Sequence, residues 1–273
     1  VGLDLSRPRI MGIVNVTPDS FSDGGQLGDA QAAIDHARRL EDAGADVVDI
    51  GAESTRPGSD PVPLDEERRR VLPVIEALAG KVEARISIDT RKADVMRDAV
   101  AAGADIVNDI SALSFDLHAL STVAELGVPV ILMHALGDPK TMQDNPTYDD
   151  VLLDVFDYLE ARIEACVRAG IARDRIVIDP GIGFGKTLEH NLALLGGLSL
   201  LHGLGLPVLV GASRKRFIGA LSGVEVARER VAGSIGAALA AAGQGAQIIR
   251  VHDVAETRQA LSVWQAATQG AVL

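Results

Sequence analysis

The chain has 273 residues, of which 47% are apolar but only 3% aromatic, and its formal net charge at pH 7 is −12. An interior poor in aromatic residues must be built from Val, Ile, Leu and Ala, which is typical of parallel sheets covered by helices and argues against an all-β sandwich. The negative charge argues against binding of a nucleic-acid backbone or an anionic membrane surface. A β/α barrel commonly occupies about 250 residues, so we expect residues 1–273 to form one domain.

Two further absences in the sequence bear on location. No apolar run approaches the ~18 residues that span a bilayer, and the N-terminus has no basic segment followed by an apolar one. We therefore expect a cytoplasmic protein. The single cysteine, Cys166, cannot form an intramolecular disulfide, and its helical surroundings indicate an inert thiol.

Short β-branched runs alternate with amphipathic helical segments along the whole chain. The expected strands are Arg9–Val16, Ala45–Ile50, Arg85–Ile88, Ile106–Asn108, Val128–Met133, Ile176–Ile178, Pro207–Val210 and Ile248–Val251. The clearest expected helices are Ala30–Ala43, Leu64–Leu78, Arg91–Ala101, Asp149–Ala169 and Val254–Ala267. Most of the strands are apolar on both faces, as parallel strands buried by helices are. Eight such β-α units predict an α/β fold, a single (β/α)8 TIM barrel.

A weak internal repeat supports this organisation. The segments "AGADVVDIG" (Ala43–Gly51) and "AGADIVNDI" (Ala102–Ile110) each close a helix with glycine and enter the next strand. Other helix-to-strand junctions carry a glycine at which a positive φ can cap the helix, namely Gly127, Gly170, Gly205 and Gly245. The repeat is therefore one of supersecondary units and not of domains.

Polar, glycine-rich and charged sequence collects after the expected strands, whereas the opposite junctions are short and plain. The longest of these segments are "NVTPDSFSDGG" (Asn15–Gly25), "GAESTRPGSDP" (Gly51–Pro61), "HALGDPKTMQDNP" (His134–Pro146), "DPGIGFGK" (Asp179–Lys186) and "GASRKR" (Gly211–Arg216). Since β/α barrels build their active sites at the C-terminal ends of the strands, we expect one composite site to which all eight loops contribute.

The two ends of the chain provide a test of closure. Asn15 ends the first strand, whereas Arg250 and His252 end the last. In a closed barrel these strands must pair, which would bring the Cα atoms of Asn15 and His252 within roughly 10 Å. An open doubly wound sheet gives no general reason for such proximity.

Three polar residues end expected strands and can point into one barrel mouth: Asp89, Asn108 and Asp179. Carboxylates beside an amide can hydrogen-bond the amino-imino edge of a flat heterocycle. Each residue alone is equally well explained as a helix N-cap, because Asp and Asn are favoured before helices. Their coincidence at three strand ends favours a ligand-binding role.

Basic residues at the same face indicate an anion site. Arg250 and His252 are two residues apart on an extended segment, so their side chains should face the same way and form a clamp; the alternative is that His252 caps the last helix. The cationic run Arg214–Arg216 either binds an anion with them or is a solvated helix end.

Several standard motifs are excluded. The "DPGIGFGK" segment fits neither phosphate-loop pattern, because Pro180 and Lys186 stand where those patterns require glycine. It is better interpreted as a turn that brings backbone close to a planar ligand, with the role of Lys186 left open. Ser213 is not a motif nucleophile, because no second glycine follows it. No histidine pairs with another His or Cys at zinc-like spacing, so a caged transition metal is not expected.

Seven motifs stand in order along the chain: "NVTPDSFSDGG", "DIGAESTRPG", "SIDT", "VNDI", "DPGIGFGK", "GASRK" and "RVHDV". Together they resemble the dihydropteroate synthase family from about Ile10 to the last helix. The resemblance implies a usually homodimeric (β/α)8 transferase of folate biosynthesis and a sulfonamide target. Its reaction would join 6-hydroxymethyl-7,8-dihydropterin pyrophosphate to p-aminobenzoate, giving 7,8-dihydropteroate and pyrophosphate.

The resemblance also implies residue roles. The pterin would be held by Asp89, Asn108, Asp179 and Lys215, with Met133 and Phe184 as apolar walls. The pyrophosphate would be held by Asn15, Arg56, Arg250 and His252, with a Mg²⁺ ion bound at Asn15. The p-aminobenzoate pocket would be formed by Phe21, Thr55, Arg56, Pro57 and Ser213. The catalytic group would comprise Asp89, Lys215, Arg250, His252 and Asp23.

One departure and two rival functions remain. Where the family commonly has Met-Gln, this chain has Ala135–Leu136, so a polar contact from that position is not expected.

A pterin-binding methyltransferase domain would keep the Asp89, Asn108 and Asp179 cradle but needs no site for pyrophosphate or an arylamine. A non-catalytic pterin-binding relative would have lost the first-loop or second-loop motifs. The segments "STRPG", "SRK" and "RVH" argue against the methyltransferase.

Overall fold

The computed structural model describes residues 2–16, 25–53, 60–137 and 141–269. Its parallel strands form one eight-stranded sheet in the order β6-β5-β4-β3-β2-β1-β8-β7. They are β1 (Arg9–Asn15), β2 (Val47–Gly51), β3 (Arg85–Asp89), β4 (Ile106–Asp109), β5 (Val130–Met133), β6 (Ile176–Asp179), β7 (Leu209–Val210) and β8 (Ile248–Val251). A parallel bridge between Ile178 and Val208 joins β6 to the segment that enters β7. The sheet therefore closes on itself, and the predicted (β/α)8 barrel is confirmed.

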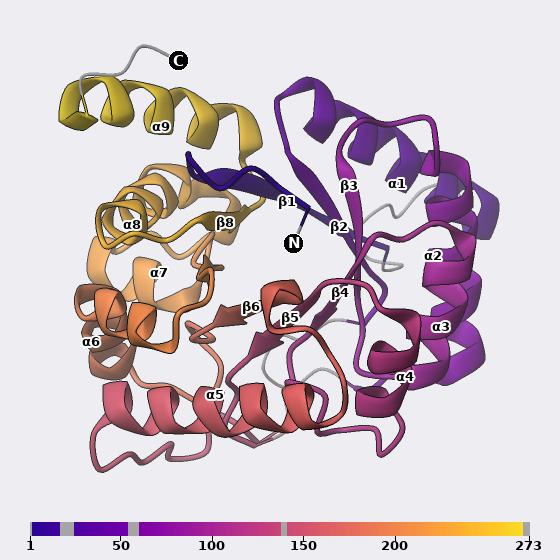
Figure 1. The fold of residues 1–273 in the computed structure, drawn as a ribbon. Helices are drawn as coiled ribbons and strands as arrows, with labels where there is room; N and C mark the ends of the chain where they lie inside the picture. Colours follow the sequence, from indigo (N-terminus) through magenta and orange to yellow (C-terminus); the bar gives the residue numbers. More distant parts are fainter. Residues whose placement is uncertain (1, 17–24, 54–59, 138–140, 270–273) are drawn as a thin grey trace.

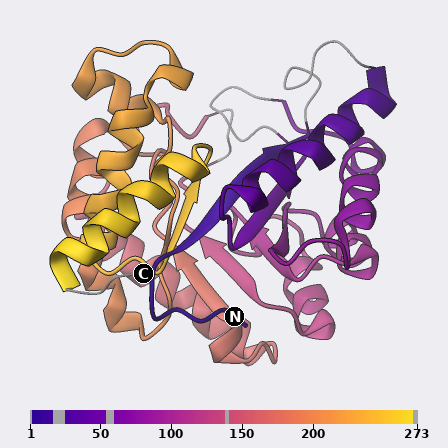
Figure 2. The same ribbon diagram turned by 90° about the horizontal axis from the view of Figure 1, so that it is seen from above.

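Helices surround the barrel and cover the outer faces of its strands (Figures 1 and 2). They are α1 (Gly25–Asp42), α2 (Leu64–Leu78), α3 (Ala93–Ala102), α4 (Ala119–Leu126), α5 (Val151–Arg168), α6 (Leu188–Gly196), α7 (Arg216–Ser222), α8 (Val231–Gly243) and α9 (Val254–Gln269). Short 3-10 helices η2 (Arg173–Arg175), η3 (Leu198–Leu204) and η4 (Ala227–Glu229) complete the connections. Within the described ranges, no helix is long and apolar enough to cross a membrane.

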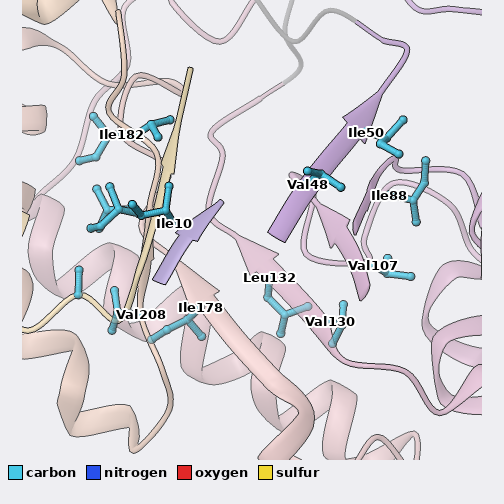
Figure 3. Close-up of a cluster of buried hydrophobic side chains, with 14 of the residues drawn as sticks. Ile10, Val48, Ile50, Ile88, Val107, Val130, Leu132, Ile178, Ile182 and Val208 are labelled. Atoms are coloured by element: carbon cyan, nitrogen blue, oxygen red, sulfur yellow. The ribbon is translucent and has the colours of Figure 1, made fainter. Parts of the chain in front are cut away.

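The side chains of each strand alternate between the barrel interior and the helices. The interior floor consists of Met11, Val47, Ile106, Ile131, Val177, Leu209 and Ile248. The outward positions belong to the larger core beneath the helices, part of which Figure 3 shows: Ile10, Val48, Ile50, Ile88, Val107, Val130, Leu132, Ile178 and Val208. On five of these strands, the residue two positions after the floor residue is Asp49, Asn108, Met133, Asp179 or Arg250. These five therefore share the inward side, one layer closer to the C-terminal mouth.

The internal repeat has a common structural basis. The aspartate that follows Gly-Ala in each copy lies at the N-terminal end of a strand and accepts a backbone N–H from the neighbouring strand. Asp46 accepts from Ile10 N at 2.9 Å, and Asp105 accepts from Ile86 N at 2.8 Å. The six glycines at the predicted helix-to-strand junctions all have positive φ: Gly44, Gly103, Gly127, Gly170, Gly205 and Gly245. The predicted helix-ending role of these glycines is confirmed.

Three expected strands begin later than predicted: β2 starts at Val47 instead of Ala45, and the other two late starts involve prolines. β5 starts at Val130 instead of Val128, and β7 starts at Leu209 instead of Pro207. Each of these two predicted starts lies at or beside a proline, which has no N–H for the ladder. The carbonyls of Pro129 and Pro207 still accept from Val107 N and Ile178 N, both at 3.0 Å. The prolines therefore lead into the strands without belonging to them.

The two ends of the chain meet as predicted. β1 and β8 pair in parallel, and Gly12 lies opposite Val251; Figure 1 shows them side by side at opposite ends of the colour scale. The pairing ends one residue before His252 and three residues before Asn15, so both side chains follow the same pair of adjacent strands. The thiol of Cys166 is free and fully buried, and burial raises its pKa to about 11, in keeping with an inert residue.

Candidate active site

The polar strand ends meet on one rim of the barrel. Asp89 ends β3 and lies opposite Asn108 of β4, while Met133 ends β5 and lies opposite Asp179, the last residue of β6. Gly51 lies opposite Asp89 on its other side, and a Cβ there would come within 3.2 Å of the Asp89 Cβ. The barrel therefore brings the expected pterin residues together and leaves space above Gly51 for the carboxylate.

Asp179, Lys215 and Phe184 form one side of this rim. Burial raises the pKa of Asp179, while nearby Lys215 and the N–H of Gly181, which donates to its Oδ1 at 2.7 Å, oppose that rise. Burial lowers the pKa of Lys215 to about 8, and the charge of Asp179 opposes that fall. Its ammonium group donates to the carbonyl of Ile182 and lies 4.6 Å from the Phe184 ring centroid. A carboxylate, an ammonium group and an aromatic face thus converge from β6, its loop and the β7 turn.

The glycine-rich loop after β6 is held at each successive carbonyl. The carbonyl of Ile182 accepts from Lys215, and that of Gly183 accepts from the Gln143 amide at 2.8 Å. The carbonyl of Phe184 accepts from Lys186 at 2.9 Å, and that of Gly185 accepts from the Tyr148 hydroxyl at 2.8 Å. Gly181, Gly183 and Gly185 all adopt positive φ, which side chains disfavour. The predicted turn is present, and its carbonyls are held by side chains from two other segments, the loop after β5 and the turn after β7, and by its own Lys186.

Lys186 is one of these partners, although its side chain is buried. Its Nζ lies 2.9 Å from His134 Nδ1 and also donates to the carbonyls of Phe184 and His134. Burial lowers the pKa of Lys186 to about 7. The pKa of His134 is lowered to about 3, mainly because the ring is buried and also because the charge of Lys186 lies beside it. A neutral His134 can accept at Nδ1, so Lys186 ties the end of β5 to the glycine-rich loop.

Arg250 points into the barrel and is shared by two carboxylates. Its Nε donates to Asp49 Oδ2 at 2.6 Å and its Nη2 donates to Asp89 Oδ2 at 2.8 Å. Asn108 Nδ2 also donates to Asp49 Oδ2, at 3.1 Å. Within the described chain, Arg250 Nη1 has no hydrogen-bond partner. One guanidinium thus links β8 to β2 and β3, with one donor group left over.

The charges of this group do not cancel, because one cation faces two carboxylates. Burial raises the pKa of Asp89 to about 7, Arg250 opposes that rise, and the charge of Asp49 adds to it. Arg250 keeps a raised pKa because the neighbouring carboxylates outweigh its burial. A raised carboxyl pKa beside a guanidinium and a second carboxylate is common among groups at functional sites.

Ser213 and His252 connect the ends of β7 and β8. Ser213 Oγ accepts from His252 N at 3.2 Å and lies 3.0 Å from His252 Nδ1. Between Ser213 and Lys215, Arg214 has a φ of 59°. Its Nε donates to Asp253 at 3.0 Å, and its N–H donates to Ser234 Oγ at 2.8 Å. The strained turn is held from β8 and α8, and it presents Ser213 and Lys215 at the mouth.

The expected cation cluster is dispersed in the structure. Arg214 pairs with Asp253, Lys215 faces the pterin rim, and Arg216 begins α7 as an exposed residue. The anion clamp also takes a different form, since Arg250 is engaged with carboxylates below the mouth and His252 with Ser213. Asn15, the expected metal ligand, is half-buried at the end of β1. Five expected residues lie outside the described ranges: Phe21, Asp23, Thr55, Arg56 and Pro57.

Sequence reasoning missed Asp49. It is fully buried in β2 and contacts two of the expected site residues, Asn108 and Arg250. The internal repeat carried a signal, because aligning its two copies places Asp49 at the position of Asn108.

The departure at Leu136 also has a structural counterpart, since a Cβ at Gly185 would lie 2.7 Å from the Leu136 Cβ. Leu136 therefore packs on the backbone of the glycine-rich loop.

Comparison with known proteins gives consistent matches. Residues 11–252 match the family described as pterin binding enzyme. The dihydropteroate synthases of Escherichia coli K12 and Haemophilus influenzae are 52% and 47% identical over 264 residues, covering 97% of this chain and 93% and 95% of theirs.

Solved structures are equally similar. A Xanthomonas albilineans dihydropteroate synthase with 4-aminobenzoic acid superimposes with a TM-score of 0.92 at 55% identity, covering 97% of this chain and 94% of that one. The same enzyme in complex with 7,8-dihydropteroate gives a TM-score of 0.89 at 52% identity, covering 97% of this chain and 95% of that one. The Yersinia pestis enzyme in a sulfonamide drug complex gives a TM-score of 0.93 at 51% identity, covering 98% of this chain and 97% of that one. The matches span nearly the whole chain.

Proposed function

The chain belongs to the dihydropteroate synthase family and is a transferase that condenses 6-hydroxymethyl-7,8-dihydropterin pyrophosphate with p-aminobenzoate; we propose that the barrel mouth performs this reaction as follows. The reaction breaks a C–O bond to pyrophosphate and forms a C–N bond to the arylamine. The products are 7,8-dihydropteroate and pyrophosphate. No enzyme nucleophile is required, in agreement with the inert Cys166 and the absence of a nucleophile motif at Ser213.

The pterin lies against Asp89, Asn108, Asp179 and Lys215 in this proposal. Asp179 accepts from the amino-imino edge of the ring, because an ionised carboxylate can accept two parallel hydrogen bonds. Phe184 and Met133 supply the apolar walls. As the C–O bond breaks, positive charge spreads from the methylene into the ring, and the Asp89 carboxylate provides opposing charge in a buried setting.

Pyrophosphate leaves toward the ends of β1 and β8. Asn15 and His252 lie on these paired strands, and Nη1 of Arg250 is the donor not used by Asp49 and Asp89. Mg²⁺ prefers oxygen ligands and usually binds through few protein groups plus substrate phosphates. The side chain of Asn15, half-buried at the end of β1, offers an amide oxygen of this kind. Asn15 would hold the ion, which would neutralise charge on the leaving group.

The p-aminobenzoate pocket would combine Ser213 with the second-loop residues Thr55, Arg56 and Pro57, and with Phe21 and Asp23 of the first loop. The two loops follow β1 and β2, which are neighbours in the sheet and lie between β8 and β3. This arrangement would place the arylamine beside the methylene. Sensitivity to sulfonamides is part of the same proposal, since a Yersinia pestis relative forms a sulfonamide drug complex.

A homodimer in the cytoplasm completes the proposal. An apolar groove between α6, α7 and α8 is lined by residues that include Leu192, Leu195, Phe217, Leu221 and Ala237. Apolar surface of this kind commonly marks a protein interface. A cytoplasmic location accords with a chain whose one cysteine is a free buried thiol.

The observation that carries the proposal is the convergence of Asp89, Asn108, Asp179 and Lys215 from four strand ends onto one rim. The direct test incubates the protein with the pterin pyrophosphate, p-aminobenzoate and Mg²⁺ and assays dihydropteroate and released pyrophosphate. Both products should form in equal amounts, and omission of any one component should abolish them. A protein that binds the pterin yet forms no product would be a binding relative instead.

A further inference from the structure

Asp49 lies beneath the pterin rim and belongs to no role assigned above. Its side chain is fully buried in the middle of β2, two residues beyond the floor residue Val47. Burying a carboxylate in a barrel interior is costly unless it is paired and hydrogen-bonded. Its pairing is incomplete, because Asp49 Oδ1 has no hydrogen-bond partner among the described residues. A residue kept at such a cost requires an explanation beyond packing.

The contacts of Asp49 all lead to the rim. Its Oδ2 accepts from Arg250 Nε at 2.6 Å and from Asn108 Nδ2 at 3.1 Å. The first contact fixes the plane of the guanidinium, whose Nη2 then reaches Asp89. The second engages the amide nitrogen of Asn108, which leaves the amide oxygen as the acceptor for a ring N–H. One buried carboxylate thus determines how two neighbouring residues present themselves to a ligand.

We propose that Asp49 is a positioning residue for the pterin: it orients the Asn108 amide and the Arg250 guanidinium from below, and so sets the donor and acceptor pattern of the pocket floor. The proposal rests on the assignment of Asn108 and Asp89 to the pterin. It predicts that Asp49 affects the pterin and not the p-aminobenzoate, because its contacts lead to Asn108 and Arg250 and neither of these is assigned to the p-aminobenzoate pocket.

Asp49→Asn is the informative substitution, since it keeps the shape of the side chain and removes its charge. The amide oxygen can still accept from Arg250 and Asn108 in the place of Oδ2, but it lacks the charge that pairs with the guanidinium, and the amide nitrogen would occupy the buried Oδ1 position as a donor without a partner. Affinity for a pterin, measured by calorimetry, should fall by about tenfold, which is the cost expected when a charge-assisted hydrogen bond becomes a neutral one. KM for p-aminobenzoate should stay within about twofold of the wild-type value, which corresponds to a change smaller than one hydrogen bond.

The matched control is Asp46→Asn at the other end of the same strand. Asp46 is also ion-paired, to Arg7 and Arg9, but lies at the N-terminal end of the barrel. This variant should lose stability and keep its pterin affinity. Equal losses of pterin affinity in the two variants would reduce Asp49 to a structural ion pair and overturn the proposal.

A double-mutant cycle with Asn108→Ala separates this proposal from the one on which it rests. If Asp49 acts through Asn108, the two losses of pterin affinity should be clearly less than additive. If Asn108→Ala leaves pterin affinity unchanged, the pterin cradle itself is wrong. If Asn108→Ala weakens binding while folded Asp49→Asn binds normally, only the positioning role is overturned. If Asp49→Asn does not fold, Asp49→Glu is the substitute, because it keeps the charge but displaces it. This variant should also weaken pterin binding, and a normal pterin affinity of Asp49→Glu would overturn the proposal.

Discussion

Asp179 carries the clearest expectation for a single residue. The Asp179→Ala variant loses the acceptor for the amino-imino edge of the pterin, and losing a charged hydrogen-bond partner costs roughly 1.5–3 kcal/mol. Calorimetry with a pterin should show that loss. Asp157→Ala, on the exposed face of α5, is the control and should bind as the wild type does. Unchanged affinity in Asp179→Ala would remove this residue from the pterin site.

Lys186 provides a second expectation, in the pH dependence of stability. Its pKa in the folded protein is about 7, against 10.5 for the ordinary side chain. Between these two values the unfolded chain holds a proton that the folded chain has released, so this group makes the free energy of unfolding rise with pH. Below about pH 7 both states are protonated, and the contribution to the slope vanishes.

The measurement is urea unfolding of the wild type and of Lys186→Met from pH 6.5 to 10. The stability difference between wild type and variant should shift in favour of the wild type as the pH rises through this range. Lys81→Met replaces an exposed lysine and should show no such trend. Parallel pH profiles for the wild type and Lys186→Met would show that the buried amine does not titrate in this range.

How far single residues were predictable depended on where they lie in a strand. Asp89, Asn108 and Asp179 stand out because each ends an apolar run, and a barrel gathers strand ends at one face. Asp49 lies within such a run and is followed by Ile50, so only its inward orientation, known once the register is known, reveals its contacts. The partners of Arg250 were inaccessible for the same reason, because they come from strands 161 and 201 residues away along the chain.

The glycine-rich loop after β6 shows how an element can be specified by close approach. At Gly181, φ is +68° and a Cβ would lie far inside van der Waals contact with the carbonyl oxygen of His134. At Gly205, which ends η3, φ is +67° but nothing lies within 4 Å of such a Cβ. The two positions therefore share one backbone conformation and differ only in the space around it.

Alanine substitution at both positions separates strain from crowding. Gly205→Ala should lower the free energy of unfolding by about 1–2 kcal/mol, the usual cost of the left-handed region for a residue with a Cβ. Gly181→Ala should lose a further 1–3 kcal/mol or so from overpacking. It should also weaken pterin binding, because Phe184 and Lys186 lie on the displaced loop. Denaturation and calorimetry check both, and equal stability of the two variants would contradict the close approach to His134.

At the level of elements, the strand and helix order was predictable and the boundaries less so. Helix α5 was expected from Asp149, but Asp150 caps it by accepting from Leu152 N and Leu153 N at 2.9 and 3.2 Å. Periodicity alone does not show which of the adjacent Asp149 and Asp150 is the cap, because an aspartate is a favoured N-cap at either position. The late starts of β5 and β7 have the analogous cause in Pro129 and Pro207.

An apolar region on the outside of the described part of the barrel lies uncovered. The groove between α6, α7 and α8 contains Leu192 and Leu221, which are 41% and 57% exposed. Helix α8 is built almost entirely from small residues, with the sequence VAGSIGAALAAAG, so another helix can approach its backbone closely. A symmetric dimer uses the same patch on both copies, and a self-complementary apolar groove meets that requirement.

The proposed homodimer predicts that a charge in this groove favours the monomer. Leu221→Glu places a carboxylate from each copy in the apolar contact, where an unpaired buried charge is strongly unfavourable. Val263→Glu is the matched control, because Val263 is 67% exposed on α9 and does not line the groove. Sedimentation velocity over a range of concentrations should give a dimer for the wild type and Val263→Glu, and a shift toward monomer for Leu221→Glu. Because α7 begins beside Lys215, activity at each concentration also shows whether association stabilises the turn that carries Ser213 and Lys215. A Leu221→Glu protein that remains as fully dimeric as the control would place the interface elsewhere on the barrel.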